Sequence, residues 1–337
     1  MRKLATVETI KSIKPHLNAD SLELATVRGW QVVVKKGEFQ EGQECVYCEI
    51  DSVLPPRPEF AFLEPRGYRV RTIKLRGELS QGIIFPASVL PEGGTVNVSS
   101  WIPGDDVTEV IGVKLYEPPV STHLCGNALG PFPHFIPKTD EERAQNMFDM
   151  IKGNANRLWV GTEKLDGASC SIHYLNGNFG VSSRNLQLKE TDNNAYWVMV
   201  RRMEIEEKLT AYCKKNNANI AIQGELIGPK VQGNPYGLSN YDYRIFNVFD
   251  IDKQDYYNFD SMMDFLDETN LLPCPILHVN QPLDWLTDVN SLLAKSDGNS
   301  LVSRNKVARE GIVWRTMDSP RISFKAISNK FLLKSQD

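Results

Sequence analysis

Apolar and polar residues alternate in short stretches over the first third of the chain, with glycine, proline or asparagine between the stretches. A period of two residues predicts β-strands, and the intervening residues predict tight turns. The predicted strands are Thr6–Ile13, Leu22–Val27, Trp30–Val34, Cys45–Ile50, Tyr68–Leu75 and Gly82–Phe85. Five or more such strands with short loops predict a small β-barrel, to which we assign residues 1–115.

The pattern fades over residues 116–135, which are rich in proline, glycine and small residues, so we assign them to a linker. A polar segment follows, in which Thr139 or Asp140 is placed to cap a helix that carries Glu142 and Arg143.

Strand and helix periods mix in the rest of the chain. The alternating segments are Val160–Lys164, Ala168–Leu175, Phe179–Ser183, Ile220–Ile227, Tyr243–Ile251, Gly311–Arg315 and Ile322–Ile327. Helices are predicted over Ala195–Lys215 and around Ser261–Leu266 and Ser291–Lys295. Asn176-Gly177 predicts a two-residue hairpin turn. Because the order lacks regular βαβ units, we predict an α+β catalytic domain over residues 136–337.

Composition narrows the class of protein. The 337 residues are 41% hydrophobic and 24% charged, as expected for a soluble globular chain with two cores. No stretch approaches the ~20 apolar residues of a membrane span, and the N-terminus lacks a secretory signal. We therefore expect an intracellular protein without membrane association, most simply a monomer. Cys45 and Cys48 form the one C-x-x-C pair, and we expect reduced strand cysteines there.

Local charge carries more information than the net charge of −4. The segment Arg66–Arg76 holds five basic residues and no acidic one. As a strand it would direct Arg69 and Arg71 to one face, and Lys74 and Arg76 to the other. Either this face contacts a phosphate backbone, with Arg69 and Arg71 as candidate nucleic-acid contacts, or charge protects a solvated edge strand.

Residues 160–167, Val-Gly-Thr-Glu-Lys-Leu-Asp-Gly, contain the strongest candidate chemistry. A lysine amine with a reference pKa near ~10.4 is a poor nucleophile until cationic neighbours or desolvation lower that value. Lys-x-Asp-Gly is the nucleotidyl-transfer signature of covalent ligases and mRNA capping enzymes, in which the lysine attacks the α-phosphate of a nucleoside triphosphate. Taken alone, the four residues are a weak pattern, which an ordinary hairpin turn with surface charges explains better.

Five further segments follow Lys164-Leu-Asp-Gly167 in a fixed order. They are Ser183-Arg184-Asn185, Gly224-Glu225-Leu-Ile-Gly228, Phe246-Asn-Val-Phe-Asp250, Glu310-Gly-Ile-Val-Trp314 and Phe324-Lys325-Ala-Ile327. Their order and spacing resemble motifs I, Ia, III, IIIa, IV and V of covalent nucleotidyltransferases. Each segment alone would be explained as a strand end, a core residue or a surface charge, but their joint occurrence by chance is very unlikely.

The whole chain resembles the RNA ligase 5 family, of the Deinococcus and Naegleria type. Residues 136–146, Ile-Pro-Lys-Thr-Asp-Glu-Glu-Arg-Ala-Gln-Asn, are typical of RNA ligases, and residues 16–25 resemble the opening of OB-type tRNA-binding modules. The resemblance implies an N-terminal OB fold, a nucleotidyltransferase domain, and ATP-dependent joining of 3′-OH and 5′-phosphate ends. The implied intermediates are lysyl-AMP and an adenylylated 5′-end. The implied substrate is a nicked duplex, RNA or RNA/DNA hybrid, with RNA on the 3′-OH side.

The resemblance also assigns roles to single residues. The catalytic set is Lys164, Asp166, Glu310 and Lys325; Mg2+ or Mn2+ would be held by Asp166, Glu225 and Glu310; ATP would be held by Arg143, Glu163, Lys164, Gly167, Arg184, Glu225, Phe246, Lys325 and Lys330. Arg143 would meet the β- and γ-phosphates, Arg184 and Glu225 the ribose, and Phe246 the purine. Lys325 would bind the α-phosphate and lower the pKa of Lys164.

One departure and two alternatives stay open. Ile327 stands where many RNA ligases have a second motif V lysine, and whether Lys330 replaces that lysine is undecided. Only ten residues follow Ile327, so a C-terminal domain with motif VI, as in DNA ligases and capping enzymes, is expected to be absent. The alternatives are an mRNA guanylyltransferase, separated by labelling with ATP against GTP, and a non-catalytic RNA-binding relative.

Overall fold

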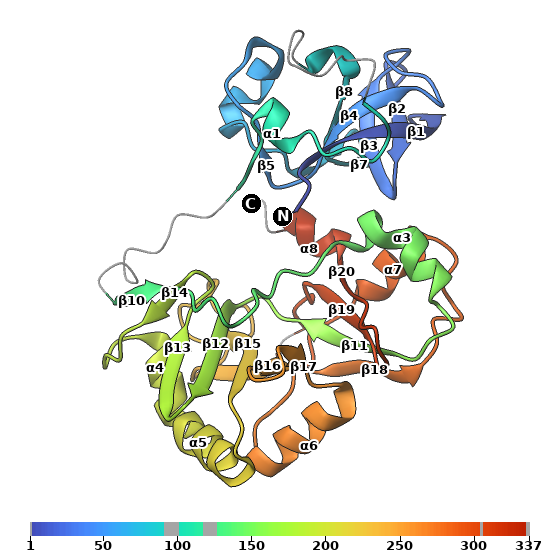
Figure 1. Cartoon of the computed structure of the whole chain (residues 1–337). Coiled ribbons are helices and arrows are strands. Elements are labelled where there is room, and N and C mark those ends of the chain that lie inside the picture. Colours follow the sequence, from blue (N-terminus) through green and yellow to red (C-terminus); the bar gives the residue numbers. More distant parts are fainter. Residues whose placement is uncertain (1, 91–100, 117–126, 304–305, 335–337) are drawn as a thin grey trace. The chain divides into compact units, whose positions relative to one another are not determined.

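The computed structural model describes residues 2–90, 101–116, 127–303 and 306–334 (Figure 1). The chain divides into two compact units. Unit 1 comprises Met1–Pro119 and Leu332–Asp337, and unit 2 comprises Val120–Phe331. Half of the predicted linker, residues 117–126, lies outside the described residues. No helix in the described ranges is long and apolar enough to cross a membrane.

Unit 1 is built on a five-stranded antiparallel sheet with the order β3-β2-β1-β4-β8. These strands are β1 (Ala5–Pro15), β2 (Leu22–Val27), β3 (Trp30–Lys35), β4 (Glu44–Cys48) and β8 (Ile83–Pro86). Smaller elements are β5 (Ser52–Val53) paired with β9 (Lys114–Leu115), β6 (Thr72–Leu75) paired with β7 (Glu78–Gln81), η1 (Pro58–Arg66), η2 (Ala87–Val89) and α1 (Thr108–Ile111). The first half of β1 pairs with β4 and the second half with β2, with a register shift between Ile10 and Ser12.

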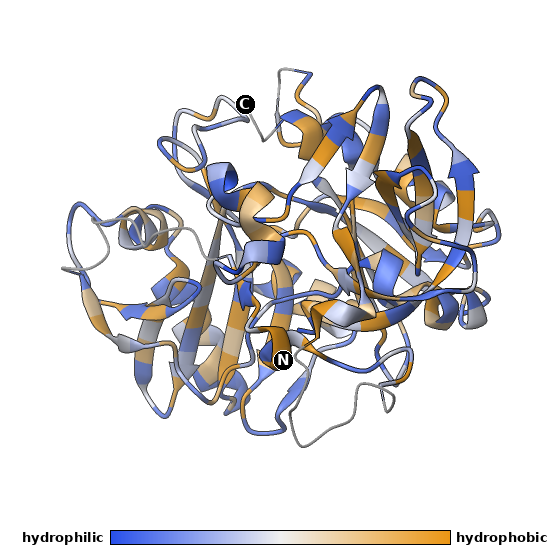
Figure 2. Ribbon diagram, turned by 90° about the horizontal axis from the view of Figure 1, so that it is seen from above, coloured by the Kyte–Doolittle hydropathy of each residue, from blue (hydrophilic) through white to orange (hydrophobic). Residues whose placement is uncertain are grey.

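Unit 1 contains two apolar clusters, to which successive residues of β4 contribute alternately. Trp30 and Tyr47 belong to one cluster, and Val46 and Phe60 belong to the other. Both faces of β4 are therefore buried, one against each cluster. Figure 2 shows hydrophobic and hydrophilic residues along the strands of the molecule. The predicted small barrel of short strands is confirmed.

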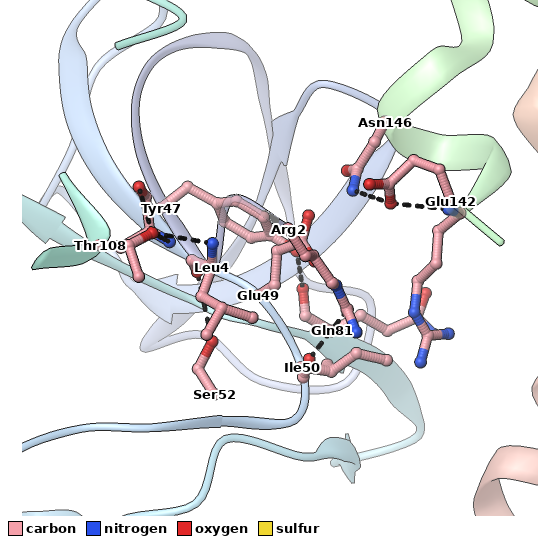
Figure 3. A network of polar contacts seen from close by, with 12 residues as sticks. Arg2, Leu4, Tyr47, Glu49, Ile50, Ser52, Gln81, Thr108, Glu142 and Asn146 are labelled. Carbon is pink, nitrogen blue, oxygen red and sulfur yellow. Dashed lines mark hydrogen bonds and ion pairs between the residues drawn. The ribbon is translucent and has the colours of Figure 1, made fainter. Parts of the chain in front are cut away.

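Polar contacts fix the start of the chain within unit 1 (Figure 3). Arg2 Nη2 lies 2.7 Å from Oε2 of the buried Glu49. The Thr108 hydroxyl oxygen accepts the Leu4 amide at 2.9 Å, and the Ser52 hydroxyl donates to the Leu4 carbonyl at 3.2 Å. Side chains from β5, from α1 and from the residue after β4 thus hold the residues that lead into β1.

The predicted strand Tyr68–Leu75 is only half correct, because β6 begins at Thr72. Arg66 ends the 3-10 helix η1, and Gly67 and Tyr68 both adopt left-handed backbone angles with φ of 59°. Arg76 also has a positive φ, of 49°, in the turn before β7. The five basic residues therefore do not lie along one strand, and the predicted distribution of their side chains over two strand faces is wrong.

Unit 2 contains two antiparallel sheets and confirms the α+β prediction (Figure 1). The seven-stranded sheet has the order β10 (Ala128–Pro131), β14 (Leu186–Leu188), β13 (Asn178–Ser182), β12 (Ala168–Leu175), β15 (Ile220–Ile227), β16 (Asp242–Asp250) and β17 (Asp255–Tyr256). The four-stranded sheet has the order β18 (Ile276–Gln281), β11 (Trp159–Lys164), β19 (Gly311–Thr316) and β20 (Ser323–Ile327). The helices are α3 (Ala144–Gly153), α4 (Ala195–Arg202), α5 (Ile205–Asn216), α6 (Phe259–Thr269) and α7 (Val289–Ser296), and α8 (Asn329–Lys334) begins in unit 2 and ends with residues assigned to unit 1.

Local sequence explains most of these elements. Asn176 and Gly177 have φ values of 50° and 86° and join β12 to β13 in the predicted hairpin. The single helix predicted over Ala195–Lys215 is wrong, because Glu204 with φ of 55° divides it into α4 and α5. The apolar faces of both helices still pack on the sheet core.

The helix predicted to be capped by Thr139 or Asp140 begins later, at Ala144. The Glu142 carbonyl accepts the Lys325 amide at 2.7 Å, so the backbone just before α3 pairs with β20 and cannot be helical. The Glu142 carboxylate accepts the Asn146 side-chain amide at 3.0 Å (Figure 3). Tertiary pairing therefore determines where the helix begins.

Candidate active site

Strand register brings Lys164 and Glu310 together across β11 and β19. Lys164 is the last residue of β11 and pairs with Gly311, the first residue of β19. Glu310 directly precedes that strand, and its Oε1 lies 2.7 Å from Lys164 Nζ. Two motifs that are far apart in the sequence thus form one ion pair.

The turn after Lys164 lies against β15, which carries Glu225. Ser169 of β12 pairs with Glu225, so the Asp166-Gly167 turn lies over this part of the sheet. A Cβ atom on Gly167 would lie 2.5 Å from the Leu226 carbonyl oxygen. The glycine of Lys-x-Asp-Gly is therefore required by close packing on β15, and the structure places no side-chain chemistry there.

Burial and mutual repulsion change the protonation of this cluster. Burial, with repulsion from Glu310 and Asp166, raises the pKa of Glu225 to about 8 despite the attraction of Lys164. Burial and Glu310 raise the pKa of Asp166 to about 6. Burial disfavours the charged form of Lys164, but the carboxylates of Glu310, Glu225 and Asp166 outweigh it and raise the lysine pKa. The three carboxylates therefore act against the lowered lysine pKa expected from the sequence.

These shifts predict that the contribution of Glu225 and Asp166 to stability falls as the pH rises from about 5 to 8, whereas the lowered pKa of the buried His173 acts in the opposite direction below about pH 6.5. Glu225 and Asp166 have raised pKa values, so the folded state binds more protons than the unfolded state in this range. The raised pKa of Lys164 adds no slope there, since the amine is protonated in both states. We expect Glu225→Gln to remove roughly 1–3 kcal/mol of this pH-dependent change in the free energy of unfolding. Urea unfolding at pH 5 and pH 8 measures it, and the same slope in Glu225→Gln as in the unchanged protein would contradict it.

Lys325 lies on the same face of the four-stranded sheet as Lys164. Lys325 pairs with Val313, Val313 pairs with Thr162, and Thr162 is two residues before Lys164 in β11. A parallel bridge joins Arg143 to Lys325, and Arg143 is buried, with 6% of its surface exposed. Two of the predicted phosphate contacts are thus neighbours.

The predicted base-stacking residue, Phe246, lies in β16 near a register shift between Gln223 and Gly224. It packs against the buried cluster of Leu165, Ile227, Tyr236 and Cys274, which contains the residue next to Lys164. Phe249 is buried in a different cluster, as expected for a core residue. One aromatic ring is therefore half-buried beside the Lys164 turn, and the other is part of the core.

Three other predicted site residues are held by different partners. Arg184 pairs with Asp140 at 2.8 Å, and both side chains are exposed. Glu163 accepts the Leu301 amide at 2.9 Å and is buried. Lys330 pairs with Asp297 at 3.0 Å, while Ile327 is buried in its place on β20. A small hollow adjoins Arg184 and is lined by Phe132, Lys138, Thr139, Asp140, Ser169, Ser171 and Arg184.

Two further residues of this region have no place in the predicted site. Arg315 donates to Glu141 at 3.1 Å, and its guanidinium carbon lies 5.8 Å from the centre of the Phe246 ring. Arg315 is two residues after Val313 in β19, so it lies on the same strand face as Lys325 and Lys164. The alternation of the sequence could therefore have predicted Arg315 as a site residue. Tyr236 accepts the Asp166 amide through its hydroxyl, and no motif in the sequence marks that loop residue.

Within the ranges described, no group of three histidine, cysteine, aspartate or glutamate side chains is arranged to enclose a metal ion. Asp166, Glu225 and Glu310 nevertheless shift one another's pKa values or that of Lys164, so they share one electrostatic environment. The buried Cys45 and Cys48 are free thiols, and burial raises the pKa of each to about 12. They are reduced strand residues, as predicted.

Comparisons with known proteins agree with this architecture. An OB-fold domain family matches residues 4–87, and the RNA ligase family matches residues 157–327. These matches define an OB-fold unit followed by a ligase catalytic unit. The chain belongs to the RNA ligase family. The resemblance and the fold class derived from the sequence are thereby confirmed.

Solved structures of Naegleria gruberi RNA ligase are similar over the full chain. A mutant with ATP and manganese is 39% identical, has a TM-score of 0.89, and matches 100% of both chains. The complex with pyrophosphate has the same identity, coverage and TM-score. A mutant without ligand is 38% identical over 98% of both chains, also with a TM-score of 0.89. No curated protein matches the chain.

Proposed function

We propose that this RNA ligase uses ATP to join RNA ends through a covalent AMP on Lys164. The observation that carries the proposal is the 2.7 Å contact between Lys164 and Glu310 at the end of β11, inside a cluster with Asp166 and Glu225. The similar Naegleria gruberi enzyme has been solved with ATP and with pyrophosphate, which are the substrate and the leaving group of this step.

Three transfers follow from this chemistry. The deprotonated Lys164 amine attacks the α-phosphorus, a P–N bond forms, the bond to the β-phosphate breaks, and pyrophosphate leaves. A terminal 5′-phosphate of RNA then attacks the same phosphorus and takes AMP from the lysine. Finally the 3′-OH attacks the adenylylated 5′-phosphate, AMP leaves, and a phosphodiester forms.

The chain's own charges suit these steps. Lys325 lies on the strand face of Lys164 and would neutralise the α-phosphate, and the neighbouring Arg143 would hold the β- and γ-phosphates. Phe246 would stack on the purine. Arg184 would reach the ribose after separating from Asp140. Roles for Glu163 and Lys330 in ATP binding keep least support, because other groups in unit 2 occupy both side chains.

A divalent cation fits the acidic cluster. Carboxylate oxygens are the ligands that Mg2+ and Mn2+ prefer, and the raised pKa values of Glu225 and Asp166 show an excess of buried negative charge. When bound, the cation would supply positive charge that favours the neutral form of Lys164. Without it, Glu310, Glu225 and Asp166 hold a proton on the lysine.

The proposed substrate is a nicked duplex with RNA on the 3′-OH side, in RNA or an RNA/DNA hybrid. We assign residues 1–115 to duplex binding through the OB fold and residues 136–337 to catalysis; of the linker expected over residues 116–135, Ala128–Pro131 joins the catalytic sheet as β10. Two assays test the substrate: labelling with ATP against GTP, and sealing of nicks with RNA or DNA on the 3′-OH side. Labelling by GTP alone would instead favour a guanylyltransferase, and equal sealing of both nicks would remove the RNA requirement.

The structure changes the prediction for the basic segment of unit 1. Arg69 lies 2.7 Å from Asp51 and stacks at 3.6 Å on the Tyr116 ring, so its removal would also disturb the fold. Arg71 is exposed and is the better test. We expect Arg71→Ala to weaken binding of a nicked duplex severalfold and to reduce the salt slope by about one, with lysyl-AMP formation unchanged. Binding measured at several salt concentrations checks this, and an unaltered slope would place the phosphate contacts elsewhere on unit 1.

A further inference from the structure

A loop from another part of unit 2 holds the turn that follows Lys164. The loop comprises residues 228–241, between β15 and β16. The hydroxyl oxygen of Tyr236 accepts the Asp166 amide N–H at 2.6 Å. From the same loop, Gln232 Nε2 donates to the Gly167 carbonyl at 3.1 Å. Two consecutive residues of the turn are thus bonded to one loop.

Tyr236 is itself firmly anchored. It is 3% exposed, and its ring packs with Leu165, Ile227 and Cys274. The Tyr236 carbonyl accepts the Ser303 hydroxyl at 3.3 Å. A hydroxyl on such a fixed ring offers the turn a rigid acceptor.

The loop also has internal bonds that limit its motion. The Asn234 side chain donates to the Leu238 carbonyl at 2.9 Å and accepts the Leu238 amide at 3.0 Å. The Asn234 amide donates to the Val231 carbonyl at 2.7 Å. Tyr236 lies inside this closed segment, so its position is set before any ligand binds.

The Asp166 amide needs such an acceptor because the strand ladder ends before it. The last register pair of β11 is Lys164 with Gly311, and β12 begins at Ala168. Beyond the ladder, small rotations of the turn would move the Asp166 side chain relative to Lys164 and Glu310. Reactions that depend on alignment are sensitive to such movements.

We propose that Tyr236 is a positioning residue for adenylyl transfer, and that its hydroxyl holds the turn that follows Lys164 and carries Asp166. This inference rests on the proposed chemistry of Lys164. The ring of Tyr236 packs in the cluster that Phe246 joins, so one side chain connects the proposed base-stacking residue to the reacting turn.

Tyr236→Phe tests the proposal because it keeps the ring and removes only the acceptor. In single-turnover labelling with ATP and Mg2+, we expect the maximum rate of lysyl-AMP formation to fall roughly 10- to 100-fold. The ATP concentration at half-maximal rate should change less than about threefold, since the lost bond is not to ATP. Tyr257→Phe, which removes a hydroxyl bonded to Tyr212 elsewhere in unit 2, is the matched control.

An unchanged maximum rate in Tyr236→Phe, or a loss confined to the half-maximal ATP concentration, would overturn the inference. If Tyr236→Phe is unfolded at the assay temperature by circular dichroism, Gln232→Leu decides, because that exposed side chain makes the second bond to the turn. Gln232→Leu should slow the maximum rate severalfold, and a full rate would again overturn the inference. Labelling of the unchanged protein separates the two claims: no AMP on Lys164 there ends the proposed function itself.

Discussion

Replacing Lys164 by alanine is expected to abolish formation of the covalent AMP and sealing of a nick that carries a 5′-phosphate. We expect both rates to fall by at least roughly 10³-fold, as in other enzymes that lose their nucleophile. A nick that already carries the adenylylated 5′-end should still be sealed, because its AMP no longer has to pass through the lysine. Gel assays with ATP labelled in the α-phosphate and with both kinds of nick measure these outcomes.

The surface offers a matched control for Lys164→Ala. Lys215 pairs with Glu268 at 2.8 Å on the surface of the same unit. This is also a lysine–glutamate ion pair, but it lies outside the candidate site. Lys215→Ala should label and seal as the unchanged protein does. Normal covalent labelling of Lys164→Ala would refute the lysine mechanism, and loss of sealing on the adenylylated nick would show that the substitution damages more than the first step.

Glu310→Gln is expected to slow lysyl-AMP formation about 10²- to 10³-fold without unfolding the protein. Its carboxylate lies 2.7 Å from Lys164 and belongs to the proposed cation site. The Mg2+ or Mn2+ concentration needed for half-maximal rate should rise by about 10- to 100-fold. Titrating each cation in the labelling assay measures this, with Glu268→Gln as the control from the surface pair.

The direction of the Glu310→Gln effect distinguishes two roles. Glu310 is among the carboxylates that raise the pKa of Lys164, so its removal leaves more neutral amine at a given pH. If pairing with Lys164 were its only function, the variant would therefore react faster. The proposed cation role predicts a slower reaction, and an unchanged rate with unchanged metal dependence would exclude that role.

Motif order predicted the candidate site well because strand pairing follows from the same residues. Lys164 and Gly311 are the ends of two alternating stretches that pair in register, so Glu310 must come close to the lysine. Asn176-Gly177 predicted its hairpin for a similar local reason, the left-handed backbone that both residues adopt. Where a local preference and the tertiary pairing agree, the pattern of the chain is sufficient.

The sequence was less informative where tertiary contacts decide. Arg69 looked like a free strand residue, but Asp51 and Tyr116, both far from its own segment, hold it. The prediction of a low pKa for Lys164 was based on the neighbouring cation Lys325. It did not include the summed charge of three carboxylates that come together only in the folded chain. Tyr236 has no motif, since any buried hydroxyl at that point in space would serve the Asp166 amide.

Mapping of the adenylylated residue tests the central claim most directly. The unchanged protein is incubated with α-labelled ATP and Mg2+, digested, and analysed by mass spectrometry. We predict that AMP is attached to the peptide that contains Lys164, through the lysine amine, and that pyrophosphate reverses the labelling. AMP on any other residue, or sealing of 5′-phosphate nicks without a covalent adduct, would contradict the account.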